Sequence, residues 1–230
     1  IPSFPKSGRN WVRFLLANSI AVASGRDIDI HFLNSSEWIS TTVPKTPPVE
    51  DGYPRIAADH GEYRGQDTRV IYILRHPADV MEAYYVYLRD RRNEPVGEFS
   101  GFIRDEEGGV PAWKSHITSW HGEIDVLVTF EGLKKDPGER LREMYSLFER
   151  DIDDETVAKA VERSSFENMA RMEKKYGIPQ KHGANNDFTF MRQGESSQGE
   201  AYFDDDDYRY LWETAGDIMR RYDYDVPVEV

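Results

Sequence analysis

Two stretches of the chain are almost continuously apolar. Residues 69–74 (RVIYIL) and residues 125–130 (DVLVTF) carry few polar side chains. A strand with one face in water alternates between apolar and polar residues, whereas a strand covered on both faces does not. The two stretches therefore predict central strands of a parallel sheet. Shorter segments at residues 1–5 and 55–59 predict two further strands.

Apolar residues at helical spacing lie between these strands. Leu141, Met144, Tyr145 and Phe148 follow one another at i, i+3, i+4 and i+7, which forms one stripe of a helix that begins at Pro137. Similar spacing predicts helices at residues 10–24, 110–123, 154–162, 166–176 and 205–222, and from Pro77 onward. Proline- and glycine-containing segments predict loops at residues 26–54 and 177–197 and a mobile loop at 97–109.

The alternation of strands and helices predicts the fold class. It is typical of a three-layer α/β fold with a central parallel sheet. Neither a repeat nor a linker divides the sequence, so residues 1–230 are predicted to form a single domain. In such folds ligands bind beyond the carboxyl ends of the strands. Residues 6–9, 75–76 and 130–131 follow predicted strands and are expected at that edge.

Composition narrows the function classes. The formal net charge is −13, and an acidic chain of this kind disfavours a general nucleic-acid surface, which needs a basic face. The longest apolar stretch, within residues 12–23, is too short and too polar to span a bilayer. There are no cysteines, which excludes disulfides and thiolate metal sites. Together, these features of the composition predict a protein that binds neither nucleic acid nor membrane and is located in the cytoplasm.

The segment PKSGRNW links the first predicted strand to the first helix. Gly8 permits a ligand to approach the backbone closely, and the N–H groups at a helix start attract anions. Lys6 and Arg9 add positive charge, while Ser7 and Asn10 add hydrogen-bond donors. The segment predicts an anion-binding turn, and the alternative is a plain strand–helix turn with surface cations. It differs from the phosphate loop of nucleotide hydrolases, in which the lysine follows the glycine.

Five segments together resemble the cytosolic-type sulfotransferases, which use 3′-phosphoadenosine-5′-phosphosulfate (PAPS). The first is PKSGRNW, similar to the family's phosphosulfate loop. The others, in chain order, are VIYILRHPADV (70–80), FEGLKKDP (130–137), SSFENM (164–169) and FMRQG (190–194). The resemblance implies a fold with a phosphate-binding strand–loop–helix similar to a P-loop. It also implies an enzyme that transfers the sulfuryl group of PAPS to a small alcohol, phenol or amine and releases the product PAP, with no metal.

The resemblance also implies roles for individual residues. His60 would be the general base in an in-line transfer, and Lys6 would stabilise the leaving oxygen. Arg75 and Arg192 would bind the 3′-phosphate. Trp11 would pack against the adenine from one side, with Phe166 on the other. The full set of expected cofactor-binding residues is Lys6, Ser7, Gly8, Arg9, Asn10, Trp11, Arg75, Phe130, Ser164, Phe166, Arg192, Gln193 and Gly194.

The sequence departs from the family pattern at several of these segments. Ala83 stands where the family has a serine for the 3′-phosphate, and Ala58 replaces a lysine near the sulfuryl group. Gln193 replaces the lysine of the family's F-M-R-K-G segment, and Arg9 could compensate for a lost cation. Two alternatives therefore stay open: a degenerate, non-catalytic nucleotide-binding module, and a small-molecule kinase on a related fold.

The acceptor pocket is the least patterned part of the sequence. Its walls are expected from residues 26–57, 89–115 and 180–200. His116 could line it. Five aromatic residues could line it or belong to the core: Tyr84, Tyr85, Tyr87, Trp113 and Trp120.

Overall fold

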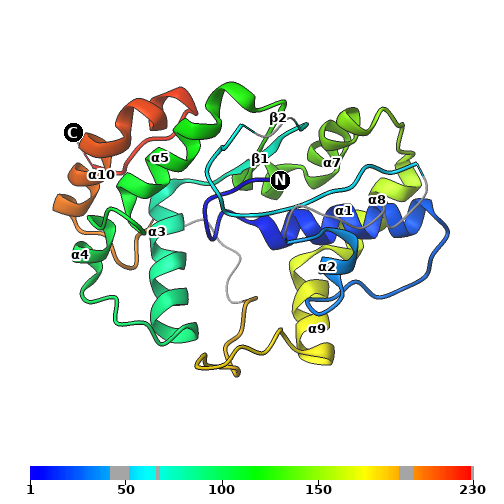
Figure 1. The fold of residues 1–230 in the computed structure, drawn as a ribbon, viewed down its shortest axis with the longest axis horizontal. Coiled ribbons are helices and arrows are strands. Elements are labelled where there is room, and N and C mark those ends of the chain that lie inside the picture. The colour runs from blue at the N-terminus through cyan, green and yellow to red at the C-terminus, as the bar shows by residue number, and fades with distance from the viewer. Residues whose placement is uncertain (42–51, 66–67, 192–198, 229–230) are drawn as a thin grey trace.

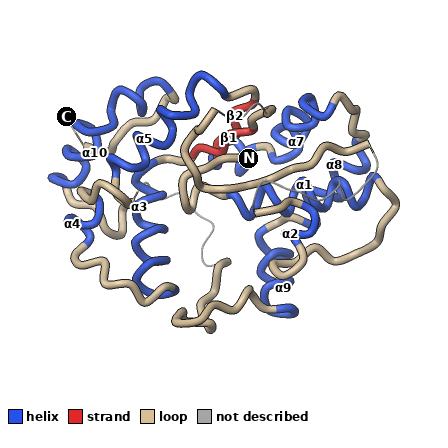
Figure 2. The backbone as a smooth tube through the Cα atoms, viewed as in Figure 1, coloured by secondary structure: helices blue, strands red, loops and turns tan. Residues whose placement is uncertain are grey.

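The computed structural model describes residues 1–41, 52–65, 68–191 and 199–228. Its sheet is built on two parallel strands, β1 (Ile71–Leu74) and β2 (Val126–Thr129), in the register Ile71 to Val126. Single parallel bridges extend it: Ser3 pairs with Ile73, Pro2 with Asp59, and Ser40 with Ala57. The extended segments therefore lie in the order 40, 57–59, 2–3, β1, β2. Figure 2 shows β1 and β2 side by side.

Strand β1 sends alternate side chains to two separate hydrophobic cores. Ile71 and Ile73 belong to the first core, whereas Tyr72 and Leu74 belong to the second. All four residues of β1 are buried, as expected of a strand covered on both faces. The continuous apolar pattern of the predicted strand thus reflects two cores, one on each side of the sheet, and the fold has three layers.

The first core is covered by helices that begin with the N-terminal segment. Figure 1 shows α1, α7 and α8 together on this side of the sheet. The helices whose residues contribute to this core or pack beside it are α1 (Arg9–Ala23), α2 (Ser35–Trp38), α6 (Phe130–Lys135), α7 (Pro137–Tyr145), the short η3 (Ser146–Phe148), α8 (Asp154–Arg163) and α9 (Phe166–Tyr176).

The second core lies on the opposite face, where Figure 1 shows α3, α5 and α10. The helices that surround it are α3 (Pro77–Val86), the π-helical turn η1 (Tyr87–Arg91), α4 (Phe99–Ile103), α5 (Val110–Trp120) and α10 (Asp205–Arg221). The short η2 (His121–Glu123) follows α5 and buries no residue. None of the helices in the described ranges is long and apolar enough to cross a membrane.

Helix starts follow their sequence signals. Asp136 caps α7 by accepting a hydrogen bond from the N–H of Glu139 at 2.9 Å, and Ser165 caps α9 in the same way at 3.2 Å. Pro77 and Pro137 occupy the first turns of α3 and α7, where a missing N–H costs nothing. These local signals explain why the predicted helix starts agree with the structure within one residue.

The structure corrects four of the expected elements. The predicted mobile loop at 97–109 contains helix α4, because Phe99, Phe102 and Ile103 bury their side chains in the second core. The strands predicted at residues 1–5 and 55–59 form only single bridges. Strand β2 ends at Thr129, whose side chain accepts from the N–H of Gly132 and starts α6, so Phe130 is helical.

Candidate functional site

The turn at residues 6–9 is held in an unusual backbone conformation. Lys6 has a φ of +68° and Gly8 a φ of +102°, both on the left-handed side that L-residues disfavour. Gly8 immediately precedes α1, so the first N–H groups of that helix point out of its start without intrahelical acceptors. The Ser7 hydroxyl is buried, and no hydrogen-bond partner for it exists in the described part of the chain. These donors suit an anionic ligand.

Gly8 also lies against an aromatic ring. A Cβ placed on Gly8 would come within 2.7 Å of Cδ2 of Phe130, which is closer than real Cβ contacts. The position therefore needs glycine both for its positive φ and for the space that Phe130 occupies.

We expect Gly8→Ala to lower the free energy of unfolding by about 2–5 kcal/mol, from left-handed strain together with overpacking. Gly25→Ala is the matched control, because Gly25 also has a positive φ (+68°) but nothing lies within 4 Å of its would-be Cβ. That change should cost only about 1–2 kcal/mol. Urea unfolding of both variants measures the difference, and equal losses would show that the Phe130 contact is unimportant.

A pocket of about 1010 Å³ opens beside this turn. The turn contributes Lys6, Gly8 and Arg9, and α1 contributes Asn10 and Trp11. Nine of the thirteen expected cofactor-binding residues line the pocket, and a tenth, Ser7, is buried in the turn itself. The other three expected residues, Arg192, Gln193 and Gly194, lie outside the described residues.

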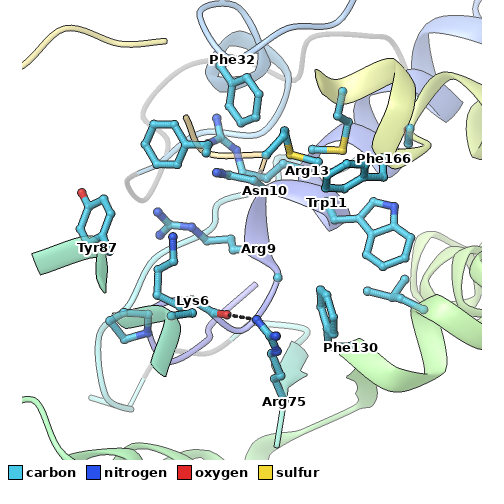
Figure 3. A pocket seen from close by; sticks show the side chains of 18 of the residues that line it. Lys6, Arg9, Asn10, Trp11, Arg13, Phe32, Arg75, Tyr87, Phe130 and Phe166 are labelled. Carbon is cyan, nitrogen blue, oxygen red and sulfur yellow. Dashed lines mark hydrogen bonds between the residues drawn. The ribbon is translucent and has the colours of Figure 1, made fainter. Parts of the chain in front are cut away.

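The Arg75 side chain is fixed from several sides. Its Nη1 donates to the Lys6 carbonyl at 3.4 Å, and its Nη2 lies 3.7 Å from the Asp79 carboxylate (Figure 3). The guanidinium also stands 4.3 Å from the ring centre of Phe130. Desolvation lowers the pKa of Arg75, and the Asp79 carboxylate opposes this shift. Arg75 thus presents a positioned cation near the turn.

Lys6 points to a different part of the pocket. Its Nζ lies 4.8 Å from the ring centre of Tyr87 and 5.6 Å from that of Phe190. Tyr87 begins the π-helical turn η1, which directly continues α3. The ammonium group is therefore held between two aromatic faces at the pocket wall.

Aromatic side chains also form the wall on the other side of the turn. Trp11 packs edge-on against Phe130 with ring centres 5.6 Å apart, and both line the pocket with Phe166 (Figure 3). Below them the buried Ser164 hydroxyl accepts a hydrogen bond from Nδ2 of Asn18 at 3.1 Å. This part of the pocket suits a planar, uncharged ring system.

His60 lines the same pocket. Its Nδ1 lies 2.7 Å from the Ser3 carbonyl oxygen, which can only accept, so Nδ1 carries the proton. The other ring nitrogen, Nε2, then holds a lone pair. Desolvation and, next, the positive charge of Arg9 lower the pKa of His60, although water reaches the exposed residue and screens part of this shift. His60 is therefore a neutral imidazole with one defined acceptor nitrogen.

The predicted acceptor-pocket walls and aromatic candidates can be compared with the residues that line the pocket. Each of the three predicted wall segments contributes lining residues, such as Phe32, Arg91 and Lys181. Tyr84 and Tyr87 line the pocket, whereas the remaining three aromatic candidates, Tyr85, Trp113 and Trp120, are buried in the second core.

His116 is buried in the protein interior, where its Nδ1 lies 2.7 Å from the Tyr72 hydroxyl, and it is absent from the pocket lining. Ala83, on α3, lines the pocket. Ala58 does not line the pocket, because it is fully buried in the first core.

Arg13 is one of the lining residues that the sequence prediction missed, and it is charged and buried. A signal for it existed, because this arginine interrupts the apolar stretch at residues 12–23 and has no role in an ordinary buried helix.

Comparison with known proteins identifies the relatives of this chain. Residues 1–223 match the sulfotransferase domain family. Human sulfotransferase 2A1 is 23% identical over 185 residues, which are 74% of this chain and 65% of that protein. Zebrafish (Danio rerio) sulfotransferase 6B1 is 24% identical over 223 residues, 87% of this chain and 71% of that protein. The chain thus spans about two thirds of the length of these relatives.

Solved structures show the same fold. Mouse sulfotransferase SULT7A1, complexed with PAP, has a TM-score of 0.66 at 20% identity and covers 96% of this chain and 84% of its own. Retinol dehydratase in complex with androsterone and PAP has a TM-score of 0.69 at 14% identity, over 99% of this chain and 81% of its own. The α/β fold predicted from the sequence is confirmed by these neighbours and by the parallel sheet.

Proposed function

Because the chain belongs to the sulfotransferase domain family, we propose that it is a PAPS-dependent sulfotransferase acting on a small alcohol, phenol or amine. One observation carries the proposal. A single pocket contains the cationic turn at residues 6–9, an aromatic wall and a neutral histidine with a defined lone pair. These are the parts that binding a phosphosulfate and deprotonating a hydroxyl require.

The described residues fit a phosphosulfate nucleotide. The unpartnered Ser7 hydroxyl and the N–H groups at the start of α1 suit its 5′-phosphate, and Gly8 keeps the approach open. Trp11 and Phe166 would enclose the adenine. Arg75 would bind the 3′-phosphate as a charged fork. Ala83 offers no hydroxyl there, so the 3′-phosphate relies more on arginine than in the family pattern.

The reaction would proceed in line. Nε2 of His60 takes the proton of the acceptor hydroxyl while the acceptor oxygen forms a bond to sulfur. The bond between sulfur and the bridging oxygen breaks, and its electron pair stays on that oxygen as part of PAP. Lys6 stabilises the charge that develops there. The proton ends on His60 and the sulfuryl group on the acceptor, so the step balances without a further reactant.

Two other functions compete with this proposal. A non-catalytic nucleotide-binding module would bind PAP but transfer nothing, so radiolabelled sulfuryl transfer from PAPS to a panel of alcohols, phenols and amines separates it from the enzyme. Failure of every acceptor together with tight PAP binding would favour the module.

The second competitor, a small-molecule kinase, would bind its nucleotide with magnesium. We expect PAP to bind this protein equally well in EDTA, because Lys6, Arg9 and Arg75 supply positive charge from the protein itself. Isothermal calorimetry with PAP, in EDTA and in magnesium, measures this. ATP serves as the comparison ligand. A strict magnesium requirement, or a preference for ATP over PAP, would overturn the sulfotransferase proposal.

A further inference from the structure

Arg13 is a buried cation in the wall of the pocket. It lies one helical turn after Arg9 on α1, and the residue is only 7% exposed. Its sequence neighbours Val12 and Phe14 are fully buried in the first core, yet Arg13 lines the pocket. The guanidinium therefore faces the pocket from an otherwise apolar helix.

Two of the three side-chain nitrogens of Arg13 have no hydrogen-bond partner among the described residues. Nε and Nη2 of Arg13 are buried and have no hydrogen-bond partner in the described part of the chain. Arg91, another buried arginine of the same pocket, donates instead to the carbonyl oxygen of Pro179 at 2.9 Å and to Oδ1 of Asn186 at 2.8 Å. Arg91 therefore has a structural role that Arg13 lacks, and a buried guanidinium without partners is destabilising.

Charge around Arg13 adds to this cost. Desolvation, followed by repulsion from Arg9, lowers the pKa of Arg13 to about 10, so the group still carries its charge at neutral pH. The described acidic residues of the pocket lining are Asp79 and Glu82, and both lie on α3. The wall that contains Arg13 thus holds a charge for which the protein supplies no counter-charge among the described residues.

The position of Arg13 separates it from Arg75, which is expected to bind the 3′-phosphate. Figure 3 shows Arg13 near Phe32 and Asn10, whereas Arg75 and Phe130 lie at the opposite end of the site. Phe32 packs against Phe14 and Phe190, with ring centres 5.0 and 5.7 Å apart. Arg13 therefore lies away from Arg75 and on the side of the site that includes Phe32 (Figure 3).

We propose that Arg13 binds an anionic group, a carboxylate, sulfate or phosphate ester, that the acceptor carries in addition to its reacting hydroxyl or amine. The proposal rests on the proposed function and specifies its substrate class: the acceptor is a negatively charged molecule. The guanidinium supplies a two-pronged donor to such a group, and the bound anion removes the cost of the unpaired charge.

A binding experiment tests this class directly. Calorimetry of the PAP-saturated protein is carried out with 4-hydroxyphenylacetate and with its uncharged amide, and separately with inorganic sulfate. We expect the carboxylate to bind about 10- to 100-fold more tightly than the amide, as for a charge-assisted hydrogen bond. Arg13→Met should remove that preference and weaken sulfate, whereas Arg220→Met, which removes an exposed cation on α10, should change neither.

Other outcomes would overturn the proposal. Equal binding of the carboxylate and the amide by the unaltered protein, no sulfate binding, or a preference that survives Arg13→Met would each do so. A tenfold loss of PAP affinity in Arg13→Met would assign Arg13 to the nucleotide instead. If the unaltered protein binds no PAP, the proposed function fails, and the carboxylate preference of the ligand-free protein still tests the anion site by itself.

Thermal unfolding of the ligand-free protein excludes a purely structural role. Removal of an unpaired buried charge should leave the melting temperature of Arg13→Met unchanged or raise it by about 2–4 °C. A clear fall would mean that Arg13 stabilises the fold, which contradicts the proposal.

Discussion

His60→Asn should lower turnover by about 10²–10⁴-fold while PAP affinity stays nearly unchanged. Asparagine can keep an amide N–H near the Ser3 carbonyl oxygen, which now accepts from Nδ1 at 2.7 Å, but it has no basic nitrogen in place of Nε2. The loss would therefore reflect the missing proton acceptor rather than a displaced side chain. Initial rates of sulfuryl transfer, with PAP calorimetry alongside, measure the two quantities.

The pH profile of the unaltered enzyme adds an independent check. Because desolvation and Arg9 lower the pKa of His60, the base stays neutral below the usual histidine pKa of about 6.5. The rate of the His60-dependent reaction should thus not fall as pH drops from 8 to 6.5. The fall in rate caused by protonation of His60 should occur below pH 6.5.

His182→Gln is the control for the His60 change. His182 is exposed and absent from the pocket lining, so its replacement should leave turnover unchanged. A fully active His60→Asn enzyme would show that another group takes the proton, whereas loss of the circular dichroism signal would point to a structural histidine.

Lys6→Met should damage both turnover and cofactor binding. A cation at the leaving oxygen is expected to contribute about 10²–10³-fold to turnover. It also contacts the bound cofactor, so PAP affinity should fall by about 10- to 100-fold. Methionine keeps an unbranched chain that can pack between Tyr87 and Phe190, where the ammonium group now lies 4.8 and 5.6 Å from the ring centres.

Lys135→Met is the matched control for Lys6. Lys135 is exposed at the end of α6 and absent from the pocket lining, so it removes the same net charge without touching the site. Unchanged turnover in Lys6→Met would remove the leaving-group role. A fall in turnover with PAP affinity intact would mean that Lys6 stabilises the transition state but does not contribute to PAP binding.

The sequence predicted the elements whose signals are local. Asp136 and Ser165 are capping residues followed by amphipathic helices, and the structure places α7 and α9 there. Helix α4 was missed because its five residues carry little periodicity and its stability comes from burial of Phe99 and Phe102 in the second core. Such contacts join distant segments and leave no local pattern.

The same distinction applies to the site. The motifs identified nine of the residues that line the pocket. Lys6, Arg75 and Phe130 among them follow extended segments at one edge of the sheet. Arg13 lines the pocket because its face of α1 is turned toward the side where Phe32 and Phe190 also lie. Phe32 and Phe190 are distant from Arg13 in the sequence. The orientation of a helix face could not be predicted from spacing alone.

The division of the protein into two hydrophobic cores has a mechanical consequence. Trp11 and Met169 of the pocket wall pack with the first core, whereas Tyr84 of α3 packs with the second. The cores share little beyond the sheet, whose two hydrogen-bonded strands are each four residues long. A nucleotide in the pocket would brace the two halves against each other from outside the sheet. Binding of the nucleotide is therefore expected to hold the two halves together and to stabilise the whole folded protein.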